Sequence, residues 1–141
     1  MCAIEEPTAI AGPPAGVLAV DDDRRFLALL RDVVGATAHL ELVAEADCGE
    51  RAVELARELA PDIVLMDVRM PGLGGIGAAR LIKGVRPSTL VVLVSTTHPD
   101  ELPREADGPL ADATIWKGEL TPRVLDETWL RHRGQTSRAE V

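Results

Sequence analysis

Short apolar runs alternate with amphipathic segments along most of this chain, and this alternation restricts its fold more than any other feature. The runs at 17–20 and 63–66 are rich in β-branched residues and are followed by polar ones, as is typical of buried strands in a parallel sheet. Strands that alternate with helices form a parallel sheet whose two faces the helices cover. We therefore predict an α/β fold with a doubly wound, five-stranded parallel sheet, its strands at 17–20, 40–46, 63–66, 90–94 and 113–116.

The amphipathic segments predict helices, several of which have recognisable ends. Asp23 is placed to cap a helix that starts at the next residue, and Thr121 followed by Pro122 is placed to begin the last helix. Asp47 and Glu50 have the spacing of a capping box. The expected helices cover 24–34, 49–59, 76–85 and 122–131.

The stretch between the fourth and fifth apolar runs calls for a further helix but contains several helix breakers. Pro99, Pro103, Gly108 and Pro109 leave room for no more than a turn or two over 100–106. We therefore predict a short or irregular fourth helix at this place.

Length and composition indicate one domain. The 141 residues, 46% of them hydrophobic, suffice for a single core. Proline and small residues dominate the first fifteen positions, and the last eight are polar without periodicity. We predict a flexible N-terminal extension at 1–15, one folded domain at 16–133 and a flexible C-terminal tail at 134–141.

Charge and cysteine content narrow the choice of partners and compartment. The net charge of -8 argues against direct nucleic acid binding, which normally needs a clustered basic face. With only Cys2 and Cys48, a disulfide framework is not expected. Because the start of the chain lacks the pattern of a signal peptide and no apolar run reaches about 18 residues, we expect a cytoplasmic protein without membrane contact.

Three aspartates stand where two of the predicted strands end. Asp21 and Asp22 follow the first strand, and Asp67 follows the third. The carboxyl ends of neighbouring parallel strands lie along one edge of a sheet, so these carboxylates would share one pocket. Like charges about 4 Å apart repel by roughly 4 kcal/mol at the effective dielectric of a protein surface. The sequence therefore predicts that a metal ion is held there.

Two further polar residues complete this set. Ser95 follows the fourth predicted strand and Lys117 follows the fifth, so both should reach the same sheet edge. With these residues in place, the sequence resembles the receiver domain of two-component response regulators from about residue 17 to residue 130. The motifs that carry the resemblance are Val20-Asp21-Asp22, Leu65-Met66-Asp67, Met70-Pro71-Gly72 with Gly75, Val94-Ser95 and Trp116-Lys117.

The resemblance implies a flavodoxin-like receiver fold with strand order 2-1-3-4-5 over residues 16–133. It also implies a phosphorelay in which Asp67 accepts a phosphoryl group from a histidine kinase or a phosphotransfer protein. Magnesium would be held by Asp21, Asp22, Asp67 and the main-chain carbonyl of Arg69. Lys117 and Ser95 would bind the oxygens of the transferred group.

By the same resemblance, this domain is a regulatory phosphoprotein, and it catalyses only its own phosphorylation and dephosphorylation. Phosphorylation would change the binding of an unknown downstream protein, and a homodimer is a further possible assembly. The family commonly has proline after the lysine and an aromatic residue three positions before it, whereas this chain has Gly118 and Thr114. Trp116 lies on the same side of its strand as Thr114, so we hypothesise that its indole takes part in signalling.

Two other functions fit parts of the pattern. A degenerate receiver would bind partners without being phosphorylated. A phosphatase of the haloacid dehalogenase type would use Asp21 as nucleophile, since the run from Asp21 to Asp23 imitates its Asp-x-Asp motif. The phosphatase interpretation leaves Asp67 without a role.

Overall fold

The computed structural model, which describes residues 13–96 and 111–140, contains the predicted parallel sheet. Its strands are β1 (Ala15–Val20), β2 (Leu40–Ala46), β3 (Ile63–Asp67), β4 (Leu90–Ser95) and β5 (Ala113–Trp116). All neighbours are parallel and the order is β2-β1-β3-β4-β5. The predicted fold class and strand order are therefore confirmed.

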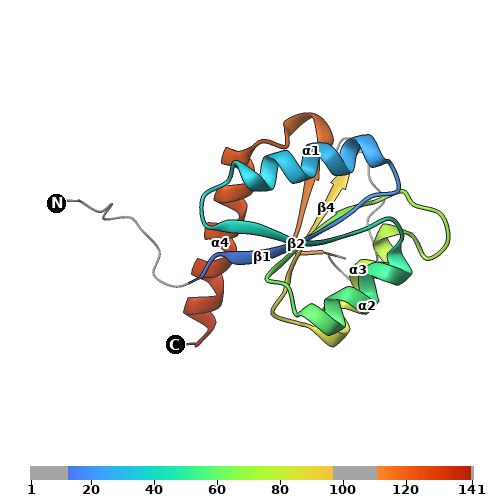
Figure 1. The fold of residues 1–141 in the computed structure, drawn as a ribbon. Helices are drawn as coiled ribbons and strands as arrows, with labels where there is room; N and C mark the ends of the chain where they lie inside the picture. Colours follow the sequence, from blue (N-terminus) through green and yellow to red (C-terminus); the bar gives the residue numbers. More distant parts are fainter. Residues whose placement is uncertain (1–12, 97–110, 141) are drawn as a thin grey trace.

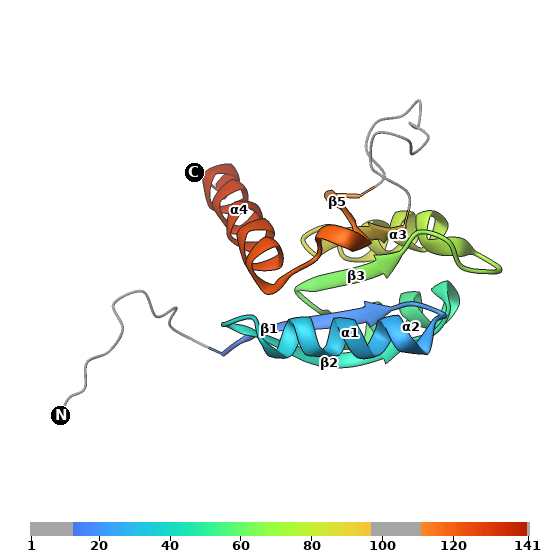
Figure 2. The same cartoon turned by 90° about the horizontal axis from the view of Figure 1, so that it is seen from above.

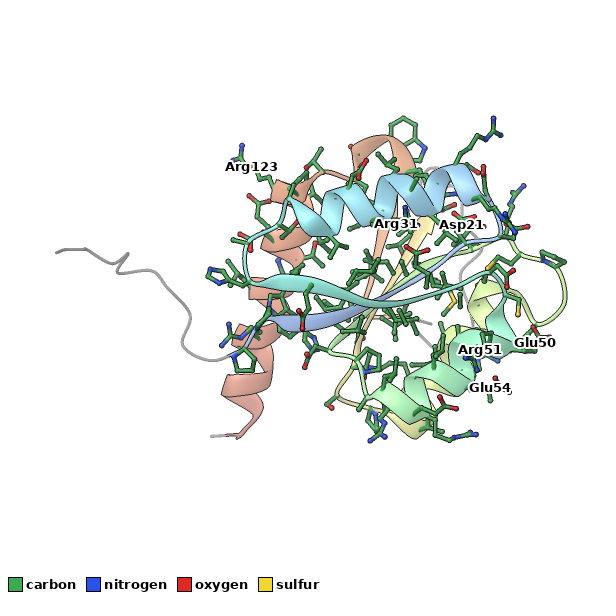
Figure 3. All side chains as sticks on the ribbon, in the orientation of Figure 1. Asp21, Arg31, Glu50, Arg51, Glu54 and Arg123 are labelled. Carbon is green, nitrogen blue, oxygen red and sulfur yellow. The ribbon has the colours of Figure 1, made fainter. Side chains whose placement is uncertain are left out.

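Helices cover both faces of the sheet (Figures 1 and 2). They are α1 (Arg24–Gly35), α2 (Gly49–Leu59), α3 (Gly74–Val85) and α4 (Pro122–Glu140), with a 3-10 turn, η2 (Lys117–Glu119), after β5. The side of β1 that carries Val17 and Ala19 packs against α1 and α4. Leu18 and Val20 point to the other side, toward α2 and α3. The chain therefore has two apolar cores, one on each face (Figure 3).

Burial along the strands explains the continuous apolar runs in the sequence. The strands β3 and β4 lie inside the sheet and are buried at every residue, because helices cover them on both sides. Full burial of a Val, Leu or Ile side chain contributes roughly 1.5–3 kcal/mol. At the edge of the sheet, β2 mixes buried, half-buried and exposed residues. Continuous apolar runs thus mark the strands that position the polar residues at their ends.

Two of the three predicted helix caps are confirmed. The Asp23 carboxylate accepts a hydrogen bond from the Arg25 amide at 2.9 Å, at the start of α1. The Thr121 hydroxyl accepts from the Val124 amide at 3.2 Å, at the start of α4.

The prediction of a capping box at Asp47 and Glu50 is wrong. The N-cap of α2 is Cys48, which makes no side-chain cap hydrogen bond. The Glu50 carboxylate instead accepts a hydrogen bond from the Leu73 amide at 3.3 Å, in the turn before α3. A tertiary contact between the starts of two neighbouring helices has replaced the local one.

The last helix is longer than the sequence predicted. It continues to Glu140 instead of ending near Arg131. No proline follows Pro122, and the lone Gly134 costs a helix only about 1 kcal/mol relative to alanine. The short or irregular fourth helix expected over 100–106 lies outside the described residues. No helix in the described ranges has both the length and the apolar character needed to cross a membrane.

Candidate functional site

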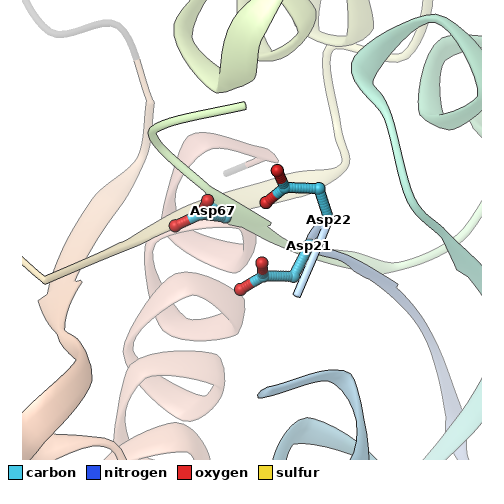
Figure 4. A group of neighbouring side chains, drawn as sticks. All are labelled: Asp21, Asp22 and Asp67. Atoms are coloured by element: carbon cyan, nitrogen blue, oxygen red, sulfur yellow. The ribbon is translucent and has the colours of Figure 1, made fainter. Parts of the chain in front are cut away.

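The ends of β1 and β3 bring three aspartates together. Val20 pairs with Met66 in register, so Asp21 and Asp67 follow paired positions on adjacent strands. Carboxylate oxygens of Asp21, Asp22 and Asp67 all lie within 4.8 Å of one another (Figure 4). The structure therefore places the predicted carboxylates in one cluster, which we call the acidic cluster.

Burial distinguishes the members of the acidic cluster. Asp21 is 1% exposed and Asp67 is 7% exposed, whereas Asp22 lies at the surface. One oxygen of Asp21 accepts a hydrogen bond from the Asp23 amide at 2.8 Å, which fixes the orientation of its carboxylate. Burial raises the pKa of Asp67, and the charge of Asp21 raises it further, while Lys117 acts in the opposite direction. The surroundings therefore disfavour the ionised form of the Asp67 carboxyl group.

The Lys117 ammonium lies between the two buried carboxylates. Its Nζ atom is 2.9 Å from Asp21 Oδ2 and 3.2 Å from Asp67 Oδ1. Burial lowers the pKa of Lys117, but the hydrogen bond to Asp21 and the charge of Asp67 outweigh it, so the pKa is raised. The lysine therefore stays protonated and supplies a fixed positive charge. The peptide bond from Lys117 to Gly118 is trans.

The structure also places Ser95 and Arg69 near this edge. Ser95 is the last residue of β4 and is 1% exposed. It follows Val94, which pairs with Asp67 in register. Arg69 lies in the loop that follows β3, two positions after Asp67. All the residues predicted for the site thus belong to the carboxyl end of the sheet or to the loops that leave it.

Gly75 explains how α3 can begin so close to Asp67. A Cβ atom at Gly75 would lie 1.9 Å from the Asp67 carbonyl oxygen, a separation that no side chain tolerates. The Gly75 amide also donates a hydrogen bond to the Val68 carbonyl at 3.1 Å. The first turn of α3 therefore rests directly on the backbone that carries Asp67.

One contact at the site was missed by sequence reasoning. The Lys117 ammonium lies 4.1 Å from the centre of the Phe26 ring, in cation–π geometry. Phe26 lies on the inner face of α1, where it is half-buried against the core. Since the pattern of one helix carries no information on contacts with a distant strand, no signal in the sequence could have identified this pair.

Comparison with known proteins agrees with the resemblance carried by the sequence motifs. A family model of the response regulator receiver domain matches residues 17–126. The response regulator GacA of Pseudomonas viridiflava is 40% identical over 119 residues, which are 84% of this chain and 56% of that protein. The response regulator UvrY of Escherichia coli K12 is 32% identical over 84% of this chain and 55% of its own length. The chain thus spans about half the length of these curated relatives.

Solved structures agree with the sequence matches. The response regulator domain of Thermotoga maritima CheB is 30% identical, with a TM-score of 0.65 over 86% of this chain and 95% of that one. The signal receiver domain of the putative response regulator NarL of Mycobacterium tuberculosis is 25% identical, with a TM-score of 0.71 over 87% of this chain and 99% of that one. The family predicted from the sequence motifs is confirmed: this chain belongs to the response regulator receiver domains.

Proposed function

We propose that Asp67 is a phosphoacceptor, which receives a phosphoryl group from the phosphohistidine of a histidine kinase or a phosphotransfer protein. The observation that supports this proposal best is the environment of Asp67. Its carboxylate is nearly buried at a strand end, with an ammonium group 3.2 Å away and two further carboxylates within 4.8 Å. A structural aspartate does not need this many charges around it.

The chemistry makes modest demands on the protein. A carboxylate oxygen of Asp67 attacks phosphorus, and a P–O bond forms while the P–N bond to the donor histidine breaks. The electron pair of that bond stays on the imidazole nitrogen, which then takes a proton from solvent. Because the phosphoryl group is loosely bonded to both partners in the transition state, catalysis requires mainly in-line positioning and neutralisation of charge.

The charges at the site fit a divalent ion. The acidic cluster and Lys117 sum to −2, since three carboxylates face one ammonium. Carboxylate oxygens are the donors that Mg²⁺ prefers, and Mg²⁺ keeps several waters that can bridge oxygens a few ångströms apart. Asp21, Asp22, Asp67 and the main-chain carbonyl of Arg69 would hold the ion. When bound, Mg²⁺ neutralises negative charge on the phosphoryl oxygens.

Phosphorylation adds one negative charge, because a phosphoryl dianion replaces a singly charged carboxylate. Lys117 then binds the new oxygens as a point charge, and Ser95 binds them as a hydrogen-bond donor. We propose that the modified domain acts in the cytoplasm by changing its affinity for a downstream protein or for a second copy of itself. Autodephosphorylation would return it to the resting state.

Single substitutions of the aspartates test this function. Purified protein is incubated with acetyl phosphate and Mg²⁺, and intact mass spectrometry follows the gain of one phosphoryl group. Asp67→Asn should abolish the adduct, whereas Asp21→Asn should slow its formation. Asp32→Asn, which changes an exposed aspartate on α1, is the matched control and should behave as wild type.

The other outcomes identify the alternatives. Labelling that survives Asp67→Asn but is lost in Asp21→Asn would support a phosphatase of the haloacid dehalogenase type. A wild-type protein that gains no phosphoryl group from acetyl phosphate, phosphoramidate or purified kinases would be a degenerate receiver that acts by binding alone.

A further inference from the structure

Trp116 adjoins both residues that would bind the phosphoryl oxygens. It is the last residue of β5, it pairs with Ser95 of β4 in register, and it precedes Lys117 in the chain. Its indole Nε1 atom donates a hydrogen bond to the Thr96 carbonyl at 3.1 Å. One side chain thus joins the residue before the lysine to the residue after the serine.

This hydrogen bond extends the connection between β4 and β5 beyond their backbone pairing. The paired positions run from Val92 with Ala113 to Ser95 with Trp116, where the ladder stops. Thr96 and Lys117 are the first residues beyond it. The indole therefore holds the two chain segments together at the point where the sheet no longer does.

Gly118 makes room for the indole. A Cβ atom at Gly118 would lie 2.9 to 3.1 Å from three carbons of the Trp116 six-membered ring, closer than real Cβ atoms approach their neighbours without displacing them. The ring therefore rests against a position that has no side chain. A proline at this position would also carry a Cβ atom and would meet the same ring.

We propose that Trp116 is a positioning residue that makes the Ser95 and Lys117 segments move as one unit when Asp67 is phosphorylated. The inference rests on the proposed function of Asp67. Two groups that are tied together before the reaction need not be ordered separately in the transition state, so the tie increases the rate. Its effect is indirect, because the indole acts through the segments that carry the serine and the lysine.

The chain offers a matched pair of substitutions. Trp116→Phe keeps an aromatic ring but removes the N–H donor. Trp129→Phe makes the same chemical change on α4, where the ring stacks on His132 with centroids 5.9 Å apart. Gly118→Ala is a second variant, since its methyl group would displace the Trp116 ring while Trp116 itself is retained.

The first measurement is the rate of phosphorylation by acetyl phosphate over a range of donor and Mg²⁺ concentrations. Trp116→Phe and Gly118→Ala should each lower the maximal rate about fivefold, which corresponds to one hydrogen bond between neutral groups. The half-saturating concentrations of donor and Mg²⁺ should not change, because the acidic cluster is intact. Trp129→Phe should match wild type.

The second measurement uses fluorescence. In the Trp129→Phe variant, Trp116 is the only tryptophan left, since the chain has two. Phosphorylation should change its emission, because its hydrogen-bonded partner segment moves. Adding Asp67→Asn to this variant should abolish the change.

The outcomes separate the inference from the function on which it rests. Equal maximal rates for Trp116→Phe and Trp129→Phe would overturn the inference and leave the phosphoacceptor role of Asp67 intact. A Trp116→Phe protein with weaker Mg²⁺ binding and a lower unfolding midpoint would show a merely structural role, which also overturns it. A wild-type protein that is never phosphorylated would overturn both.

Discussion

Removal of the Lys117 charge should destabilise the metal-free protein strongly. Lys117→Met keeps a long side chain near Phe26 but leaves Asp21 and Asp67 without their cation. At an effective dielectric constant of 20, the contacts at 2.9 and 3.2 Å correspond to attractions of about 6 and about 5 kcal/mol. The cost of burying the ammonium offsets part of these attractions. Breaking a buried pair costs about 3–5 kcal/mol, and we expect the free energy of unfolding to fall by that amount.

Urea denaturation with a chelator present, at about pH 7 and at about pH 5, is the assay, because this range lies above the ordinary pKa of a carboxyl group. Burial raises the pKa of Asp67, and loss of Lys117 removes the group that opposes this rise. The variant is therefore destabilised as the pH rises through the raised pKa that Asp67 has in the folded state. The loss of unfolding free energy in Lys117→Met, relative to wild type, should accordingly be smaller at the lower pH. Adding Asp67→Asn to Lys117→Met should recover part of the loss.

The control is Arg123→Met, which removes a cation whose ion pair with Glu127 is exposed. Its effect should stay within about 0.5 kcal/mol, as for other surface substitutions. If Lys117→Met loses less than about 1 kcal/mol of unfolding free energy, the electrostatic reasoning is refuted, because breaking a buried pair should cost several times more. A loss that does not depend on pH would refute it as well.

Three further predictions follow from the fold and the site. Gly75→Ala should lower the free energy of unfolding by about 1–3 kcal/mol in a urea titration, because its methyl group overlaps the Asp67 carbonyl. The control is Gly35→Ala, whose methyl group meets no atom within 4 Å and which should be neutral or stabilising. Mg²⁺ at 100 times its dissociation constant should stabilise the wild type by about 2.7 kcal/mol, a gain that a chelator reverses and that Asp67→Asn reduces. Asp23→Ala should lower the thermal unfolding midpoint, whereas Asp47→Ala should not, because only the first of these two aspartates caps a helix.

The parts of the fold that could be predicted from the sequence are those where burial leaves a continuous pattern. Every residue of β3 is buried, so its apolar run ends at Asp67, where the chain reaches the sheet edge. Parallel topology then brings Asp21 and Asp67 together without further information. The acidic cluster was therefore predictable from strand ends alone.

The details that could not be predicted depend on contacts between elements. Glu50 has the right spacing for a capping box, but in the folded chain it binds the Leu73 amide across the gap between two helices. The approach of Lys117 to Phe26 likewise joins the end of β5 to α1. A local sequence pattern does not predict contacts between distant residues, because the two partners become neighbours only when the sheet has formed.

The link between Asp21 and Lys117 has a consequence for protein synthesis. These residues are 96 positions apart in the sequence, and their side chains meet at 2.9 Å. A nascent chain that ends before Lys117 has no ammonium group to place beside Asp21 and Asp67. The phosphoacceptor site that we propose is therefore complete only after nearly the whole domain has been translated.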